Sequence, residues 1–146
     1  MTSAPSFSRF FTVGEANQLL AALRPVMERI SVMLAELRSR SEAVIRREKL
    51  VPDTPGLMER LKEDGGIVET IRHVQRLVEE INGHGCICTG VEEGLVDFPC
   101  VIGEEVVFLC WRFGEESVAH WHGIEEGYAG RRPLLDPGSA SGSTYH

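Results

Sequence analysis

The stretch INGHGCICTGV, residues 81–91, marks the change of pattern that decides the fold of this chain. Before it, apolar residues recur every three or four positions, which is typical of amphipathic helices. After it, the apolar period falls to two and glycines recur at short intervals, which is typical of strands joined by turns. The sequence therefore predicts an α+β fold, in which a long antiparallel helical hairpin over residues 10–83 is followed by a small antiparallel β-sheet from residue 84.

The first arm of the hairpin is predicted to be one long helix over residues 13–47. Thr12 can cap its first turn while Glu15 reaches back to the Thr12 amide, an arrangement known as a capping box. Pro25 lacks an amide donor and clashes with the preceding turn, so we expect a kink near residues 21–25 or a division of the helix there. Apolar residues follow the cap with near-heptad spacing, at Leu19, Leu23, Val26, Ile30, Met33 and Leu37.

The second arm is predicted to start after a turn at residues 51–55, with Thr54 as its cap and Pro55 at its first helical position. Gly65-Gly66 interrupts this helix, because each glycine costs about 1 kcal/mol relative to alanine inside a helix. Asn82-Gly83 is expected to end it with a residue in the left-handed conformation.

The second half of the chain predicts four strands, over residues 86–91, 95–101, 105–113 and 117–122. Trp111 lies in the most continuous apolar run and is expected to be buried. A three-residue loop at 114–116 would place Cys110 opposite His120 and gather Cys110, Arg112, His120 and His122 on one face. A two-residue loop would scatter these side chains, and the sequence leaves both registers open.

The chain has 146 residues, which predicts a single domain over residues 10–135, preceded by an extension at 1–9 and followed by a flexible tail at 136–146. Its 22 acidic and 15 basic residues give a formal net charge of −7, which argues against nucleic acid or an anionic membrane as a partner. Neither a secretory signal nor an apolar run long enough for a membrane span is present, so we expect a cytoplasmic protein with four reduced cysteines.

Several groups of residues together resemble the family catalogued as domain of unknown function 2203: Phe11-Thr12 with Glu15-Ala16-Asn17, Gly94-Leu95-Val96-Asp97-Phe98-Pro99, Leu109-Cys110-Trp111-Arg112 with Gly114-Glu115, and Trp121-His122 with Gly127 and Gly130-Arg131. The resemblance covers about residues 10–134. It implies a small prokaryotic protein without an established activity, and therefore supplies no catalytic residues. Gly14, Cys86 and Cys88 depart from the pattern of the family.

Polar chemistry concentrates on the predicted sheet, where the candidate ligand-binding residues are Asp97, Arg112, Trp121, His122 and Arg131. The Gly-framed loop with Arg131 and Arg132 could present guanidinium groups to a phosphate or carboxylate, or these groups could pair internally. Asp97 lies inside an apolar run and is expected to pair with Arg112 or Arg131, since it would otherwise be desolvated without compensation. No catalytic residue and no metal site is assigned. The second interpretation is a site for zinc or another divalent metal, formed by His120, His122 and Cys110.

Two functional hypotheses follow, and the first ranks higher because the sequence shows no nucleophile–base pair, phosphate-binding glycine loop or recognisable metal-ligand spacing. The first is a self-associating binding module that recognises a small anion or a protein partner, with a homodimer formed through the helices. The alternative is a small metal-dependent or acid/base enzyme centred on His122, Asp97 and Arg112. The sequence leaves the ligand and the presence of any catalysed reaction open.

Overall fold

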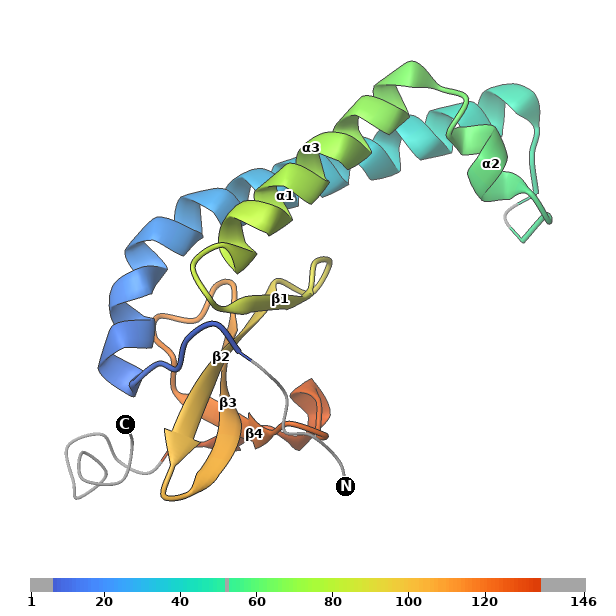
Figure 1. The fold of residues 1–146 in the computed structure, drawn as a ribbon. Helices are drawn as coiled ribbons and strands as arrows, with labels where there is room; N and C mark the ends of the chain where they lie inside the picture. The colour runs from blue at the N-terminus through green and yellow to red at the C-terminus, as the bar shows by residue number, and fades with distance from the viewer. Residues whose placement is uncertain (1–6, 52, 135–146) are drawn as a thin grey trace.

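The computed structural model describes residues 7–51 and 53–134, so the tail predicted at 136–146 and most of the extension at 1–9 lie outside the described residues. Figure 1 shows a helical hairpin that covers one face of a sheet and continues well past it. The elements in chain order are α1 (Val13–Glu48), α2 (Leu57–Leu61), α3 (Gly65–Asn82), β1 (Ile87–Gly90), β2 (Leu95–Ile102), β3 (Glu105–Arg112), β4 (His120–Gly123), the short 3₁₀ helix η1 (Tyr128–Gly130) and β5 (Arg132–Pro133). The predicted α+β fold is confirmed.

Helix α1 begins at the predicted capping box. The Thr12 hydroxyl accepts a hydrogen bond from the Glu15 amide at 3.0 Å, and the Glu15 carboxylate accepts one from the Thr12 amide at 2.9 Å. Pro25 lies inside the helix without dividing it, and Figure 1 shows α1 curving around the sheet over its N-terminal part. The division is avoided because Pro25 is exposed, so water can reach the carbonyl that lacks a donor, while buried neighbours hold both halves of the helix to one core.

The second arm differs from the prediction at both ends. Its first helix, α2, is capped by Gly56 with φ 83° and starts at Leu57, so the start predicted at Thr54 and Pro55 was wrong. The predicted interruption is present, but Gly65 and Gly66 form the first turn of α3, where no helical amide bond is lost, and Asp64 caps that turn. At the other end Gly83 is right-handed with φ −63°, and Gly85, with φ 97°, makes the reversal that Gly83 was expected to make.

The sheet has five antiparallel strands in the order β1-β2-β3-β4-β5. Cys110 lies opposite His120 and Phe108 opposite His122, which is the register that gathers the polar side chains on one face. The fourth strand starts at His120 rather than at residue 117, because Glu116 and Val118 make hydrogen bonds to side chains of α1. Asn17 accepts a hydrogen bond from the Val118 amide at 2.7 Å, and Arg24 donates one to the Glu116 carbonyl. The two-residue strand β5 was not predicted.

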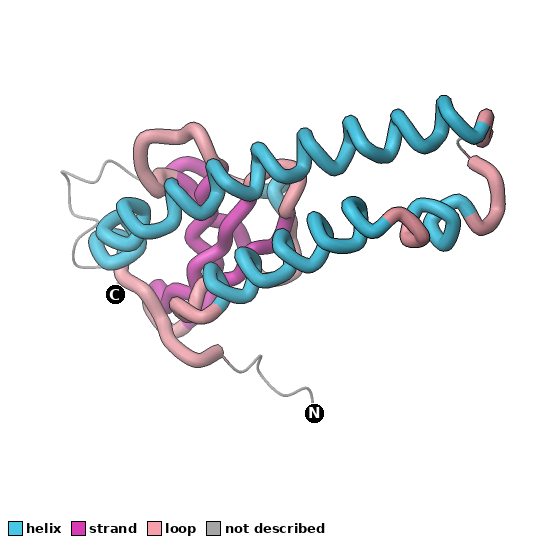
Figure 2. The backbone as a smooth tube through the Cα atoms, turned by 90° about the horizontal axis from the view of Figure 1, so that it is seen from above, coloured by secondary structure: helices cyan, strands magenta, loops and turns pink. Residues whose placement is uncertain are grey.

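The main core lies between the hairpin and the sheet. Trp111 is fully buried there, as predicted, with its ring edge-to-face against Phe113. Strand residues that face the helices alternate with those that face away, and the helix-facing set is Val96, Phe98, Cys100, Val107, Leu109 and Trp111. A separate small core of Val44, Leu61 and Ile67 holds the tip of the hairpin, which Figure 2 shows projecting away from the strands. None of the helices in the described residues is both long and apolar enough to cross a membrane.

Candidate functional site

A buried polar cluster of Asp97, Cys110 and His122 lies on the face of the sheet that points away from the helices. The three residues come from the neighbouring strands β2, β3 and β4, and Asp97 is directly opposite Cys110. Their exposed fractions are 4%, 1% and 2%, and their ligand-type atoms lie within 4.8 Å of one another. The alternation of the strands therefore brings an acid, a thiol and an imidazole together away from water.

The hydrogen bonds of His122 show that a proton or a metal ion must lie between His122 and Asp97. Its Nδ1 lies 2.7 Å from the carbonyl oxygen of Gly123, and a carbonyl can only accept, so Nδ1 carries a proton. Its Nε2 lies 3.1 Å from the Asp97 carboxylate oxygen. Two acceptor atoms at this distance need a positive charge between them, supplied by a proton or a metal ion. The prediction that Asp97 pairs with Arg112 or Arg131 was wrong, because His122 takes that place.

Burial dominates the ionisation of the other two groups. It raises the pKa of Asp97, against the opposing effect of the His122 charge and of hydrogen bonds from His122, Cys110 and Thr89. Burial, with the nearby Asp97 charge, also raises the pKa of Cys110 to about 11. Arg131 opposes this shift, since its guanidinium nitrogen Nη1 lies 3.9 Å from the Cys110 sulfur. Without a further cation, Cys110 is a neutral thiol at neutral pH.

The loop after β4 covers one side of this cluster and is held there by ion pairs. Arg131 makes a two-pronged contact with Glu115, and both side chains are largely shielded from water, at 13% and 27% exposed. The Arg131 guanidinium also lies 4.6 Å from the centre of the Tyr128 ring. Arg132 pairs with Glu126 at 2.8 Å. The arginines of this loop therefore have carboxylate partners within the protein, which favours their role in fixing the loop over a role in binding an external anion.

His120 lies beside the cluster on the same face, since it is directly opposite Cys110. Its Nδ1 is buried and has no hydrogen-bond partner among residues 7–51 and 53–134. A buried ring nitrogen without a partner is rare in folded proteins, because it loses its hydration without compensation. The Nδ1 atom of His120 could therefore donate or accept a further hydrogen bond, or bind a metal ion, beside the cluster.

The predicted site residues divide into two groups. Asp97, Cys110 and His122 form the cluster, with His120 and Arg131 adjacent to it. Trp121 and Arg112 lie outside it, since Trp121 packs against the main core and Arg112 contacts Tyr128, with 3.4 Å between its Nη1 and the phenol oxygen. Sequence reasoning did not identify Tyr128 or Thr89. Tyr128 could have been noticed as the aromatic residue between the glycines that frame the arginine loop.

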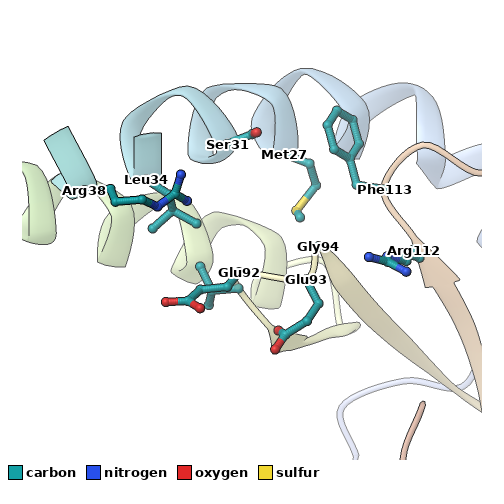
Figure 3. A pocket seen from close by; sticks show the side chains of 10 residues that line it. Met27, Ser31, Leu34, Arg38, Glu92, Glu93, Gly94, Arg112 and Phe113 are labelled. Atoms are coloured by element: carbon teal, nitrogen blue, oxygen red, sulfur yellow. The ribbon is translucent and has the colours of Figure 1, made fainter. Parts of the chain in front are cut away.

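A second feature is a pocket of about 160 Å³ where the hairpin meets the sheet (Figure 3). Arg38 and Glu92 lie on one side of it, with Glu93 and Arg112 on the other, and Met27 points between them. Gly94 is required here, because its φ is 76° and a Cβ atom would lie 2.9 Å from the Phe113 Cβ. The full lining is Met27, Ser31, Leu34, Arg38, Val91, Glu92, Glu93, Gly94, Arg112 and Phe113. No sequence signal could reveal this pocket, because it joins three distant segments.

A third feature is a shallow apolar hollow of about 490 Å³ on α1, lined by Pro25, Glu28, Arg29, Val32 and Met33. Among these residues Val32 is an exposed apolar side chain, with 63% of its surface accessible. The period of 3.6 residues puts Pro25 and Val32 on the side of α1 opposite Met27, and therefore away from the main core. The hollow is an apolar surface that nothing within the described chain covers.

Comparison with known proteins identifies a family whose description names no function. A protein-family model described as "Uncharacterized conserved protein (DUF2203)" matches residues 9–134. No curated protein and no solved structure matches the chain.

Proposed function

The chain belongs to the DUF2203 family, and from its own geometry we propose that it is a self-associating binding module. In this proposal two copies pair through their α1 helices, and each copy takes a small anion in the pocket between hairpin and sheet. The observation that carries the proposal is the exposed Val32, which lies with Pro25 and Met33 in an apolar hollow on a 36-residue helix. Isolated exposed apolar residues are ordinary, but a hollow that combines exposed apolar residues with an acidic and a basic residue is typical of an interface.

The sequence around the hollow is complementary to itself. In a two-fold antiparallel pairing, residue i meets residue j and residue j meets residue i. An axis midway between Glu28 and Arg29 sets Glu28 of each copy against Arg29 of the other. The same axis sets Pro25 of each copy against Val32 of the other. A single two-fold axis thus gives both the charged and the apolar residues of the hollow a suitable partner. The two hairpins would then form a four-helix bundle.

A charge exchange tests this pairing. Glu28→Arg alone and Arg29→Glu alone each place like charges together twice per dimer, so each should weaken dimerisation by about tenfold. The double variant restores opposite charges and should recover most of the affinity. Arg46→Glu, on an exposed part of α1 outside the hollow, is the matched control. Sedimentation equilibrium at micromolar concentration gives the dissociation constants.

The outcomes are distinct. A parent protein with a mass of 16.2 kDa at every concentration would refute the dimer. A dimer that is insensitive to all of these changes would place the interface elsewhere.

We propose that the anion binds in the pocket where the hairpin meets the sheet (the junction pocket) rather than at Arg131 and Arg132 in the loop after β4. Arg38 and Arg112 both line the pocket, and neither has a carboxylate within ion-pair distance among the described residues. The Ser31 hydroxyl adds a neutral donor. Guanidinium groups bind carboxylate and phosphate oxygens with two parallel hydrogen bonds, so two that lack an ion-pair partner can hold an anion in this pocket, although Glu92 and Glu93 also line it and Arg112 contacts Tyr128.

Titration calorimetry with inorganic phosphate tests the pocket. Arg112→Gln should weaken binding at least tenfold. Arg132→Gln should leave it unchanged, because Arg132 is paired with Glu126 outside the pocket. Equal loss in both variants, or no binding by the parent at millimolar phosphate, would contradict the proposal.

The alternative, a metal-dependent or acid/base enzyme centred on His122, Asp97 and Arg112, ranks second. His122 and Asp97 are almost closed to solvent, and Arg112 contacts Tyr128 rather than either of them. A catalytic pair needs contact with its substrate. The cytoplasm is proposed as the place of action because Cys86, Cys88 and Cys110 are free thiols.

A further inference from the structure

We propose that Asp97, Cys110 and His122 form a binding site for one zinc ion, with Nε2 of His122, the Asp97 carboxylate and the Cys110 sulfur as its protein ligands. This inference is independent of the self-association proposed above. It starts from three buried ligand-type side chains whose donor atoms lie within 4.8 Å of one another, with Nε2 of His122 and the Asp97 carboxylate placed so that a proton or a metal ion must lie between them. The strands set these positions, because the three residues share one face of adjacent strands.

The donor set fits zinc. Zinc accepts imidazole nitrogen, thiolate sulfur and carboxylate oxygen, with bonds of about 2.0–2.3 Å, so that its ligands lie about 3.3–3.7 Å apart around a tetrahedron. Nε2 of His122 and the Asp97 oxygen are already 3.1 Å apart, and all three ligand atoms lie within 4.8 Å of one another. Small side-chain movements would bring all three to bonding distance. A His120 nitrogen or a water molecule would complete the four-coordinate shell.

The second coordination sphere is also arranged as in known metal sites. A metal-bound histidine usually donates its other ring N–H to a carboxylate or a backbone carbonyl, which fixes the tautomer and the ring orientation. His122 does this through Nδ1 and the Gly123 carbonyl, at 2.7 Å. The Arg131 guanidinium beside Cys110 favours the thiolate that zinc requires.

A divalent ion would balance the charge of the cluster once Cys110 gives up its proton to bind it. An ionised Asp97 and a Cys110 thiolate together carry two negative charges, and a neutral His122 adds none. One zinc ion makes this set neutral, which is the condition for burying charges in a low-dielectric interior. The neighbouring Arg131–Glu115 pair is also neutral in sum. A monovalent cation would leave one charge uncompensated at 1–4% exposure.

Metal analysis and cobalt substitution test the site on the full chain, purified without a polyhistidine tag. Cobalt in a tetrahedral site with a thiolate ligand gives intense visible bands and a sulfur-to-metal charge-transfer band in the near ultraviolet. The key variant is Cys110→Ser, which preserves size and removes the sulfur. Cys100→Ser is the matched control, since it changes an equally buried cysteine of the same sheet that faces the helices instead. Asp97→Asn is a second site variant, in case Cys110→Ser does not fold.

The expected result is one zinc per chain in the parent and in Cys100→Ser, with the charge-transfer band present in both cobalt forms. Cys110→Ser should lose that band, and Asp97→Asn should bind zinc at least a hundredfold more weakly. The proposal is overturned if the parent takes up no stoichiometric zinc from micromolar solution. It is also overturned if the charge-transfer band survives in Cys110→Ser. In either case a proton alone lies between His122 and Asp97.

Discussion

Replacement of Trp111 is the most direct test of how the sheet supports the polar cluster. Its indole is fully buried, and its N–H donates a 3.0 Å hydrogen bond to the carbonyl of Glu115. Glu115 in turn accepts hydrogen bonds from the Arg112 amide and from Arg131, which lies against Cys110. One side chain therefore packs the main core and anchors the connection that holds Arg131.

The expected cost follows from these contacts. Trp111→Ala removes a fully buried aromatic side chain, for which about 3–5 kcal/mol of lost unfolding free energy is usual. Trp111→Phe retains most of the ring but removes the N–H, so it should cost less, about 1–3 kcal/mol, of which about 1 kcal/mol is the lost hydrogen bond. For a chain of this size, about 2–4 °C per kcal/mol gives a drop in melting temperature of roughly 6–20 °C for Trp111→Ala.

Urea unfolding followed by circular dichroism measures both variants, at one protein concentration because self-association would shift the midpoint. Trp121→Ala is the control. Trp121 is only half-buried, with the Arg132 guanidinium 4.8 Å from its ring, and should cost about 1–2 kcal/mol. A loss below 1 kcal/mol in Trp111→Ala, or equal losses in the two tryptophan variants, would refute the reasoning.

Three further changes test separate parts of the structure. Thr12→Ala removes half of the capping box and should lower stability by about 1 kcal/mol, measured by the same unfolding assay, whereas an unchanged midpoint would contradict the cap. In chelator-treated protein, burial raises the pKa of Asp97 above its ordinary 3.8, so the folded state holds this proton more tightly than the unfolded state does. The stability that it contributes is present at low pH and lost as pH rises through the raised pKa, and Asp97→Asn should flatten this part of the stability–pH curve. Because Cys86 and Cys110 have a pKa raised to about 11, only about one thiol in a thousand is ionised at pH 8, so mass spectrometry should find both alkylated slowly until urea is added.

The sequence predicts the architecture well because that architecture depends on periodicity. The switch at residues 81–91 separates helices from strands as expected, and the α1 cap follows from a local motif at Thr12 and Glu15. The failures lie where tertiary contacts override local preference. The Thr54 cap is unused because the chain continues turning as far as Gly56, and β4 starts late because Glu116 and Val118 make hydrogen bonds to side chains of α1.

The members of the cluster are among the residues that the sequence singles out, but Arg112 and Trp121 lie outside it, and its pairings were not predicted. The favourable register does bring Cys110 and His122 to one face, yet the sequence could not choose that register, because the connection over residues 113–119 is set by contacts with α1. Asp97 pairs with His122 rather than with an arginine, because Arg131 is held by Glu115. The junction pocket depends on Arg38, which is far from the sheet in sequence and gives no local signal.

The connection over residues 113–119 links the two faces of the sheet, because it makes contacts on both of them. On the helical side, Asn17 binds the Val118 amide and Arg24 binds the Glu116 carbonyl. On the polar side, the Glu115 carboxylate holds Arg131 against Cys110. The segment is longer than a tight hairpin because it must satisfy α1 and the cluster together. A shorter turn would still pair β3 with β4, but it would leave Arg131 without its carboxylate and the cluster of Asp97, Cys110 and His122 without this part of its cover.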